Sequence, residues 1–216
     1  MKQDQIFSGI ARLKAMKEEH EGTAALMDAL RPRFAALANR HQNGTAPKAI
    51  AAFNLFQTPK PLAAKMAELA DLRPGLRLME PSAGLGRILR ACEAQAENLQ
   101  TLAVEIDTNC AGELFKNHGD LKILQRDFLT VTPEETGLFD RVVMNPPFKM
   151  RRDIKHIRHA LDFLAPGGIL VALCFSTDHR REAFAEIAEH FETIPAGTFR
   201  AEGTGVETIL LKIRKV

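Results

Sequence analysis

Short apolar runs alternate with helical patterns between residues 76 and 175, and this alternation constrains the fold more than any other feature. Buried parallel strands are apolar along their whole length, whereas the helices between them are apolar on one face. Strands are predicted at residues 76–80, 102–106, 121–124, 141–144 and 169–175. Residues 193–199 and 206–213, with Gly203 and Gly205 between them, predict an antiparallel hairpin. The chain is therefore expected to be an α/β protein with an antiparallel finish.

The predicted helices fill the gaps between the strands. Two of them end near residues 70 and 96, and three more cover about 109–118, 151–164 and 182–190. Residues 165–168 read as a turn. Thr58 is expected to cap the first of these helices, with Pro59 at its first position, and the free amides there could receive a carboxylate.

The strand at residues 141–144 ends in Asn145, Pro146, Pro147 and Phe148. Neither proline can donate a backbone hydrogen bond, so the strand must stop there. Asn145 is thereby held at a strand's carboxyl end, where open α/β sheets bind ligands. The Asn145 side-chain oxygen and the Pro146 carbonyl could accept hydrogen bonds from an exocyclic amino group, and Phe148 could stack on a flat ring. A plain strand-ending turn is the alternative.

A small-residue turn with two glycines follows the strand that ends at Glu80. The segment Glu80-Pro81-Ser82-Ala83-Gly84-Leu85-Gly86 opens a helix, as in nucleotide-binding folds, but position 89 is Leu where a dinucleotide fingerprint would place a third glycine. With Glu80 before the turn, a pyrophosphate fits poorly, and a cationic ligand with an amino group, such as S-adenosylmethionine, fits better. Glu105 could reach ribose hydroxyls, and Asp127 beside Phe128 could bind an adenine amino group. Separately, each residue could instead be a cap or core residue.

The N-terminal 48 residues predict two helices with a linker at residues 43–47. The segment could cover the following domain or form a dimer, or it could contact nucleic acid through Arg31, Arg33, Arg40 and Lys48.

A net charge of only +2 means that any nucleic-acid affinity must come from local basic patches. One basic run follows Phe148 and comprises Lys149, Arg151, Arg152, Lys155 and Arg158, with His156 and His159 beside it. His179, Arg180 and Arg181 are expected on the same rim. Phosphates would pass there, although a solvated helix face is the ordinary explanation.

The three cysteines, Cys92, Cys110 and Cys174, lack metal-binding spacing, so no metal site is expected. Their scattered positions and the absence of a signal peptide or an apolar run of membrane length predict a cytoplasmic protein that does not contact membranes.

With these motifs in view, the chain resembles the class I S-adenosylmethionine-dependent methyltransferases of the amino-methylating branch, from about residue 53 onward. Phe56-Gln57-Thr58-Pro59 looks like the upstream cofactor motif of that branch, and the segment from Glu80 to Gly86 is similar to its glycine loop. Asn145-Pro146-Pro147-Phe148 matches the tetrapeptide shared by adenine-N6, cytosine-N4, guanine-N2 and glutamine-N5 methyltransferases. The order of the motifs resembles that of N6-adenine DNA methyltransferases.

The resemblance implies a Rossmann-like seven-stranded sheet with its last strand antiparallel, in a domain over residues 49–216. The helical extension predicted from periodicity precedes it over residues 1–48. The resemblance also implies catalysis by Asn145, Pro146, Pro147 and Phe148. The implied contacts of S-adenosylmethionine are Phe56, Thr58, Glu80, Pro81, Ser82, Ala83, Gly84, Gly86, Glu105, Ile106, Asp127, Phe128 and Asn145. The expected substrate contacts are Phe148, Lys149, Arg151, Arg152 and Lys155.

The implied reaction is methyl transfer to an exocyclic amino nitrogen of a nucleobase, with adenine N6 in DNA favoured over RNA. Guanine-N2 or adenine-N6 methylation of RNA, glutamine-N5 methylation of a protein, and a cofactor-binding assembly module stay open as alternatives. Sequence-specific DNA enzymes of this type carry a target-recognition domain, and no segment for one follows the predicted hairpin, so little base-specific readout is expected. A homodimer or a partner subunit could form through the N-terminal helices.

Overall fold

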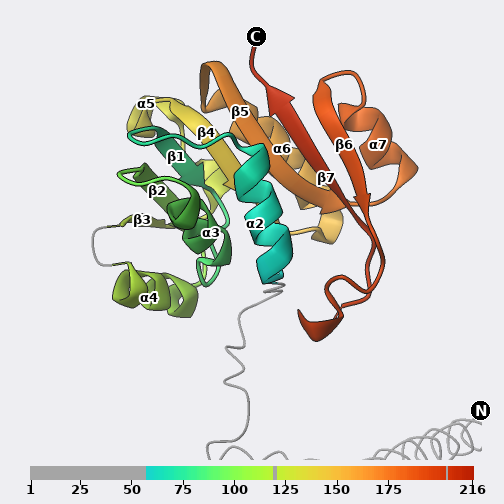
Figure 1. Cartoon of the computed structure of the whole chain (residues 1–216), viewed down its shortest axis with the longest axis horizontal. Coiled ribbons are helices and arrows are strands. Elements are labelled where there is room, and N and C mark those ends of the chain that lie inside the picture. The colour runs from blue at the N-terminus through green and yellow to red at the C-terminus, as the bar shows by residue number, and fades with distance from the viewer. Residues whose placement is uncertain (1–56, 119–120, 203) are drawn as a thin grey trace, which may run out of the picture. The chain divides into compact units, whose positions relative to one another are not determined.

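The computed structural model describes residues 57–118, 121–202 and 204–216 (Figure 1). The predicted N-terminal helices, the domain boundary near residue 48 and Phe56 lie outside the described residues and stay predictions. Among the described residues, no helix is both long enough and apolar enough to span a bilayer.

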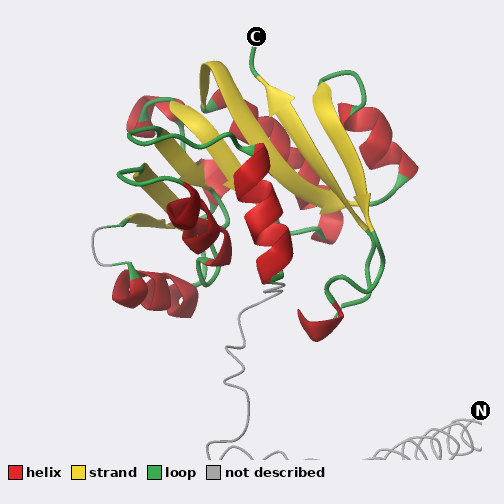
Figure 2. Ribbon diagram, viewed as in Figure 1, coloured by secondary structure: helices red, strands yellow, loops and turns green. Residues whose placement is uncertain are grey.

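The described chain forms one mixed sheet of seven strands in the order β3-β2-β1-β4-β5-β7-β6 (Figure 2). The strands are β1 Arg77–Glu80, β2 Gln100–Glu105, β3 Lys122–Gln125, β4 Phe139–Met144, β5 Leu164–Phe175, β6 Ala188–Ile194 and β7 Thr208–Arg214. The first five strands run parallel, and β7 pairs antiparallel with both β5 and β6. The predicted α/β sheet with an antiparallel last strand is confirmed.

Helices cover both faces of the sheet, as Figure 1 shows. They are α2 Lys60–Leu69, α3 Arg87–Gln95, α4 Thr108–Asn117, α5 Pro133–Thr136, α6 Arg152–Asp162 and α7 Asp178–Phe184. Successive residues of β4 and β5 face opposite sides, so Val143 packs with α2 and α3 whereas Val142 and Met144 pack with α6. Both faces are therefore buried, which explains why these strands are continuously apolar in sequence.

Two predicted boundaries near the C-terminus are wrong. The helix expected at residues 182–190 ends at Phe184, and β6 begins at Ala188 and ends at Ile194, so it does not extend to Phe199. Residues 185–190 include good helix formers, but β6 pairs along its length with β7, for example Phe191 with Leu211. Pairing and burial against a neighbouring strand outweigh this local preference.

The turn predicted at residues 165–168 is instead an irregularity inside β5. The register between β4 and β5 shifts there, since Phe139 is opposite Leu164 while Arg141 is opposite Ile169. Gly167 has φ 75°, a conformation that favours glycine. The Pro-Gly-Gly signal thus marks a bulge in a long strand rather than its boundary.

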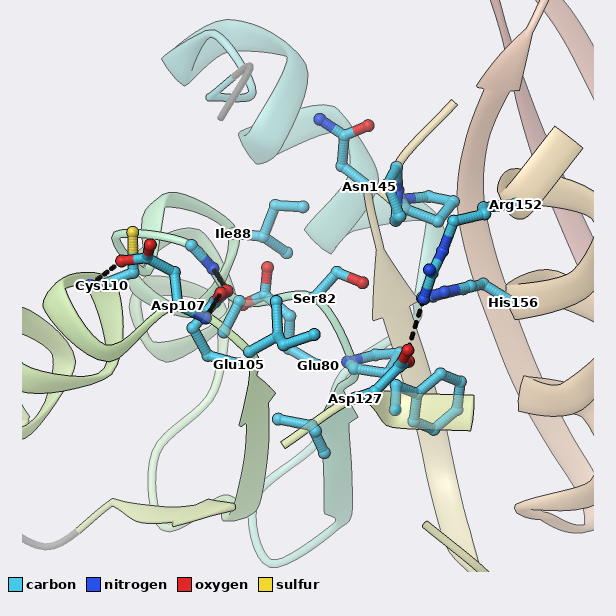
Figure 3. A pocket seen from close by; sticks show the side chains of 18 of the residues that line it. Glu80, Ser82, Ile88, Glu105, Asp107, Cys110, Asp127, Asn145, Arg152 and His156 are labelled. Atoms are coloured by element: carbon cyan, nitrogen blue, oxygen red, sulfur yellow. Dashed lines mark hydrogen bonds and ion pairs between the residues drawn. The ribbon is translucent and has the colours of Figure 1, made fainter. Parts of the chain in front are cut away.

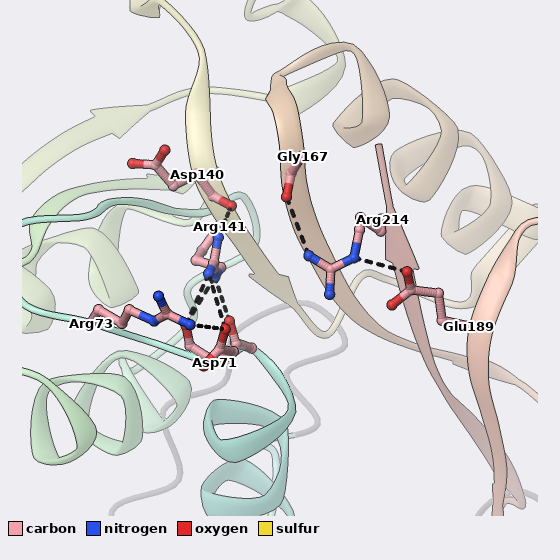
Figure 4. Close-up of polar contacts among 8 residues, drawn as sticks. Asp71, Arg73, Asp140, Arg141, Gly167, Glu189 and Arg214 are labelled. Atoms are coloured by element: carbon pink, nitrogen blue, oxygen red, sulfur yellow. Dashed lines mark hydrogen bonds and ion pairs between the residues drawn. The ribbon is translucent and has the colours of Figure 1, made fainter. Parts of the chain in front are cut away.

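Arg141 fastens the beginning of β4 to the end of α2 (Figure 4). Its guanidinium donates hydrogen bonds to the carbonyls of Ala70, Asp71 and Asp140. The carbonyls at the end of a helix lack hydrogen-bond donors within the helix, and Arg141 supplies donors to those of Ala70 and Asp71. Burial lowers the pKa of Arg141 below its usual value, against the opposing effect of Asp71. The strand that leads to Asn145 is thereby fixed at its start.

Candidate active site

The carboxyl ends of β1, β2, β3 and β4 open on a single cavity of about 540 Å³ (Figure 3). This volume lies within the range of small-molecule sites, and this edge of the sheet is where such folds bind ligands. The cavity gathers these predicted site residues: Thr58, Glu80, Pro81, Ser82, Ala83, Gly84, Glu105, Ile106, Asp127, Phe128, Asn145, Pro146, Pro147, Phe148, Lys149 and Arg152. Gly86, Arg151 and Lys155 do not line it.

Glu105 holds the turn after β1 in place. Its Oε2 accepts a hydrogen bond of 2.7 Å from the Gly84 amide, and its Oε1 accepts one of 2.7 Å from the Asp107 amide. Gly84 has φ 54°, which suits glycine and brings its backbone toward the carboxylate. A carboxylate has about four acceptor positions, so Glu105 can still accept a hydrogen bond from a ligand hydroxyl.

Glu80 ends β1 with its side chain only 2% exposed. Burial raises the pKa of this carboxyl well above its usual value, and the negative charge of Glu105 adds to the effect, whereas the backbone N–H of Leu89 opposes it. Its Oε2 has no hydrogen-bond partner among the described residues. A buried acceptor without a partner is unfavourable. A ligand ammonium in the cavity could donate a hydrogen bond to it, and the positive charge of an ammonium or a sulfonium would favour the ionised carboxylate.

Gly86 is needed for the close packing of α3 against α4 and does not line the cavity. It has φ 73° and immediately precedes α3. A Cβ at this position would lie 2.8 Å from Leu114 Cδ2, which is too close for atoms in contact. The glycine is therefore required for the turn and for the approach of α4, and direct contact with a ligand is not needed to explain it.

Asp127 is engaged on both of its oxygens. Oδ1 accepts a hydrogen bond of 3.0 Å from the Leu129 amide, and Oδ2 accepts one of 2.6 Å from Arg152 Nη2. Burial alone would raise the pKa of Asp127, but the hydrogen bonds from Arg152 and Leu129 lower it below its usual value. Arg152 thus differs from the other cations of the basic run, because it turns inward to meet Asp127 (Figure 3).

Phe128 belongs largely to the core, although it also borders the cavity. It is 2% exposed, and its ring centroid lies 4.8 Å from that of His159 and 5.3 Å from that of Phe163. By contrast, the neighbouring apolar side chain Ile106 is 62% exposed and lines the same cavity. Ile106 is therefore the more accessible apolar surface for a flat ring.

Asn145 follows β4 and reaches across the cavity mouth to Thr58. Its Nδ2 donates a hydrogen bond of 3.2 Å to Thr58 Oγ1, and Thr58 is 3% exposed. The predicted capping role of Thr58 is wrong, because Pro59 occupies the cap position of α2 and no side chain caps that helix. The Thr58 hydroxyl contributes instead to the orientation of the Asn145 amide.

The turn that follows Phe148 has an unusual backbone. Met150 has φ 53° and Arg151 has φ 57°, both in the left-handed region that residues with a Cβ seldom adopt. Met150 is 85% exposed and borders the cavity. Two consecutive residues in this conformation need support from the surrounding structure.

Four cations of the predicted basic run are exposed, and we call them the basic rim: Lys149, Arg151, Lys155 and Arg158. Within the described chain, none of the four forms a salt bridge. His156 is not part of this surface, because it is 3% exposed and burial, with help from Arg152, lowers its pKa to about 4. Arg180 is also absent from the rim, since it is 8% exposed and paired with Asp153.

Comparisons with known proteins agree with this geometry. No family model matches the chain. The modification methylase CviBIII of Paramecium bursaria Chlorella virus NC1A is 30% identical over 102 residues, which is 45% of this chain and 26% of that protein. The chain thus spans about a quarter of the length of this curated relative.

Solved structures decide the fold. TrmN from Thermus thermophilus matches with a TM-score of 0.61 at 22% identity, over 77% of this chain and 51% of that chain. An RNA methyltransferase from Salinibacter ruber in complex with S-adenosyl-L-homocysteine matches with a TM-score of 0.54 at 19% identity, over 73% of this chain and 92% of that chain. The chain has the class I S-adenosylmethionine-dependent methyltransferase fold.

Within this methyltransferase fold, the cavity contains polar residues that sequence reasoning did not assign to it. They include Arg87, Asp107, Arg126 and His156. Asp107 accepts hydrogen bonds from the Asn109 and Cys110 amides and so caps α4. Its position directly before a helical pattern was a signal for that cap. One signal in the sequence could have predicted that His156 faces inward while Lys155 is exposed. His156 lies on the apolar face of α6.

Proposed function

We propose that this protein is an S-adenosylmethionine-dependent N-methyltransferase acting on an exocyclic amino nitrogen of a nucleobase, with adenine N6 in DNA as the favoured target. The observation that carries the proposal is the meeting of two motifs in one cavity. Asn145, Pro146, Pro147 and Phe148 line the same space as Glu80, Glu105 and Asp127. A strand-ending turn alone would not require that placement.

The residues of the cavity fit the cofactor. We call the part formed by residues 80–84, Glu105, Ile106 and Asp127 the cofactor half. Its carboxyl groups suit a ligand that carries an ammonium, a sulfonium, ribose hydroxyls and an adenine amino group. Glu80 has an unpartnered oxygen for the cationic portion, Glu105 retains acceptor positions for ribose, and Ile106 offers an exposed apolar face.

A second part of the cavity, formed by residues 145–148 with Lys149 and Met150 of the following turn, we call the acceptor half. When bound, S-adenosylmethionine supplies a methyl group activated by a sulfonium. Asn145 and the Pro146 carbonyl would accept the two N–H bonds of the target amino group. Because an aromatic amino lone pair is delocalised into its ring, these hydrogen bonds favour a geometry in which the lone pair becomes available.

The bond that forms joins the acceptor nitrogen to the methyl carbon, and the bond that breaks is the carbon–sulfur bond, whose electron pair stays on sulfur. The methylated nitrogen then loses one proton to solvent. Orientation and charge stabilisation account for catalysis on this route, so no covalent nucleophile is needed. Cys110, the cysteine that lines the cavity, is a poor nucleophile there because burial raises its pKa to about 12.

Three observations support a nucleic-acid substrate. The curated relative is named a modification methylase, and one structural neighbour is an RNA methyltransferase. The exposed basic rim lies beside the acceptor half, where phosphates flanking a target base would pass. A base within a duplex would have to be flipped out, at a cost of a few kcal/mol, and Phe148 offers a ring for it to stack on.

The deciding experiment supplies labelled S-adenosylmethionine together with separate pools of DNA, RNA and protein. We expect label in DNA, with N6-methyladenine as the product identified by mass spectrometry. Label in RNA alone would move the proposal to an RNA substrate, and label in protein alone would contradict a nucleobase acceptor.

A second measurement tests the basic rim. Replacing Arg151 and Lys155 together by Gln should reduce the salt dependence of DNA binding by about two units, at roughly 0.9 per phosphate contact. Lys122→Gln on the exposed edge strand β3 is the matched control and should leave the slope unchanged. Arg152 is kept intact in this test because it contacts Asp127. An unchanged slope in the double variant would remove the rim from the proposal.

A further inference from the structure

A buried ion pair lies directly behind the acceptor half. Asp153, in the first turn of α6, is 0% exposed, and Arg180, in α7, is 8% exposed. Arg180 Nε donates to Asp153 Oδ2 at 2.6 Å, and Arg180 Nη2 donates to Asp153 Oδ1 at 3.1 Å. The pair therefore has the two-bond geometry that fixes an arginine most firmly.

The same arginine reaches the last residue of the Asn-Pro-Pro-Phe segment. Arg180 Nη2 donates to the Phe148 carbonyl at 3.3 Å, and its guanidinium carbon lies 5.3 Å from the centre of the Phe175 ring. The rings of Phe148 and Phe175 are 6.2 Å apart. Asp153 also accepts a hydrogen bond from the Phe175 amide, so both ions contact the surroundings of Phe148.

These contacts bracket the turn with the unusual backbone. Phe148 immediately precedes the turn at residues 149–151, and Asp153 follows it after a single residue. Met150 and Arg151 hold left-handed conformations that persist only when their surroundings enforce them. By fixing one residue before the turn and one after it, the Arg180–Asp153 pair supplies that enforcement.

Stability alone does not account for such a pair. Removing two charges from water is so unfavourable that a buried ion pair contributes little more than well-packed apolar residues would. What the pair provides is a defined geometry. A planar guanidinium bonds both carboxylate oxygens and the Phe148 carbonyl in a fixed arrangement, which the single nitrogen of a flexible lysine side chain does not impose.

We propose that Arg180 and Asp153 are positioning residues for the acceptor, which hold Phe148 and the turn at 149–151 in the arrangement that receives the target base. This inference rests on the proposed function. Neither residue lines the cavity, so they act through Phe148 and do not touch the substrate.

The first test needs no substrate. Lys149 and Arg151 are exposed trypsin sites inside the bracketed turn. In Arg180→Lys and in Asp153→Asn, trypsin cleavage after these residues should accelerate roughly 10-fold or more, as expected when a hydrogen-bonded charged group loses its partner. The matched control is Arg181→Lys. Arg181 is next to Arg180 but donates to Ser176 and Thr193 instead, so trypsin should cleave this variant at the wild-type rate. Unchanged cleavage in folded Arg180→Lys and Asp153→Asn variants would overturn the proposal.

The second test uses turnover. Arg180→Lys should lower kcat or raise the KM for nucleic acid by roughly 10-fold, while the Kd for S-adenosylmethionine and the melting temperature stay near wild type. In a Phe148→Leu background, the same substitution should have little further effect, because two residues that act through one another are not additive. Full additivity, or an equal loss of cofactor affinity, would contradict positioning. If the wild type methylates no acceptor, the proposed function fails, and the trypsin test still judges the role of the pair.

Discussion

The two halves of the cavity are held in different ways. In the cofactor half, the acidic side chains are fixed by backbone amides close to them in the sheet, as when Glu105 accepts from Gly84 and Asp107. In the acceptor half, the backbone after Phe148 is strained, and its support comes from Arg180 on a distant helix. Apart from the bond of Arg152 to Asp127, the cofactor half is thus built from local strand-and-turn geometry, whereas the acceptor half depends on side chains that converge from separate elements.

The comparison teaches that the halves should respond separately to substitution. A change within the cofactor half should alter affinity for S-adenosylmethionine, and a change within the acceptor half should alter turnover. Residues that line the cavity but belong to neither half, such as His156 and Thr58, should blur the distinction.

Asn145→Ala offers the largest test of this separation. Removing a hydrogen-bonding group that acts on the reacting atom typically lowers kcat by about 10²–10³-fold. Affinity for S-adenosylmethionine should stay within about threefold, less than one hydrogen bond contributes. Label incorporation measures the first quantity and calorimetry the second, with Asn117→Ala, at an exposed position that ends α4, as the control. A variant that kept substantial turnover would refute the assignment of Asn145.

The buried ring of His156, which lies between the two halves' supporting elements, should make the stability of the folded protein depend on pH. Its ring lies 5.7 Å from Phe128 on one side, and it belongs to α6, which begins at the acceptor half. Because burial lowers its pKa from 6.5 to about 4, the unfolded chain binds a proton that the folded chain cannot between these pH values. Stability should therefore fall as pH decreases from about 6.5 to about 4, by up to about 3 kcal/mol.

Urea denaturation across that pH range measures the effect of His156. His156→Leu should flatten this part of the profile, while His179→Leu, at an exposed position, should leave it unchanged. A profile that kept its full slope in His156→Leu would show that another group is responsible.

Glu105→Ala should weaken binding of S-adenosylmethionine by about 1.5–3 kcal/mol, since hydrogen bonds to charged groups contribute that much. The substitution also frees the Gly84 amide, so part of the loss comes from a looser glycine turn. Glu105→Gln keeps one acceptor oxygen and should lose less. Calorimetry on both variants, with the exposed Glu97→Ala as control, would expose an error if the folded Ala variant bound with wild-type affinity.

Thr58→Val should have the smallest effect. It removes the oxygen that accepts from Asn145 Nδ2 but keeps the shape of the side chain. The activation free energy for turnover should rise by about 0.5–1.5 kcal/mol, the value of one ordinary hydrogen bond. Thr58→Ser keeps the hydroxyl and should keep the wild-type turnover. A drop in cofactor affinity without any change in turnover would place Thr58 in the cofactor half alone.

The same contrast explains how much the sequence could predict. Glu80, Glu105, Asp127 and Asn145 each end or follow a strand, and parallel strands bring such positions to one edge. Their meeting at one edge of the sheet could be predicted from the expectation that these strands run parallel. Phe148 could be predicted as well, because the prolines before it end the strand.

The arginine contacts that support the two halves could not be predicted in this way. Arg152 and Arg180 look alike in sequence, as cations beside other cations. Whether such a side chain turns inward depends on a carboxylate brought near by folding, Asp127 in one case and Asp153 in the other. The periodic pattern of α6 predicts which face of the helix is buried. It does not predict which carboxylate each arginine binds.

The ties at the two ends of α2 make the length of this helix part of the site. Arg141 bonds the carbonyls of Ala70 and Asp71 after its last turn, and Thr58, before its first turn, bonds Asn145. The ten residues of α2 rise about 15 Å, and the strand from Arg141 to Asn145 spans about 13 Å. The helix and the strand are thus of similar length and are connected by hydrogen bonds at both ends. Inserting or deleting one residue in α2 would rotate one tie by about 100° relative to the other. Among related sequences, changes of length should therefore be excluded from α2 and appear instead in loops such as residues 96–99.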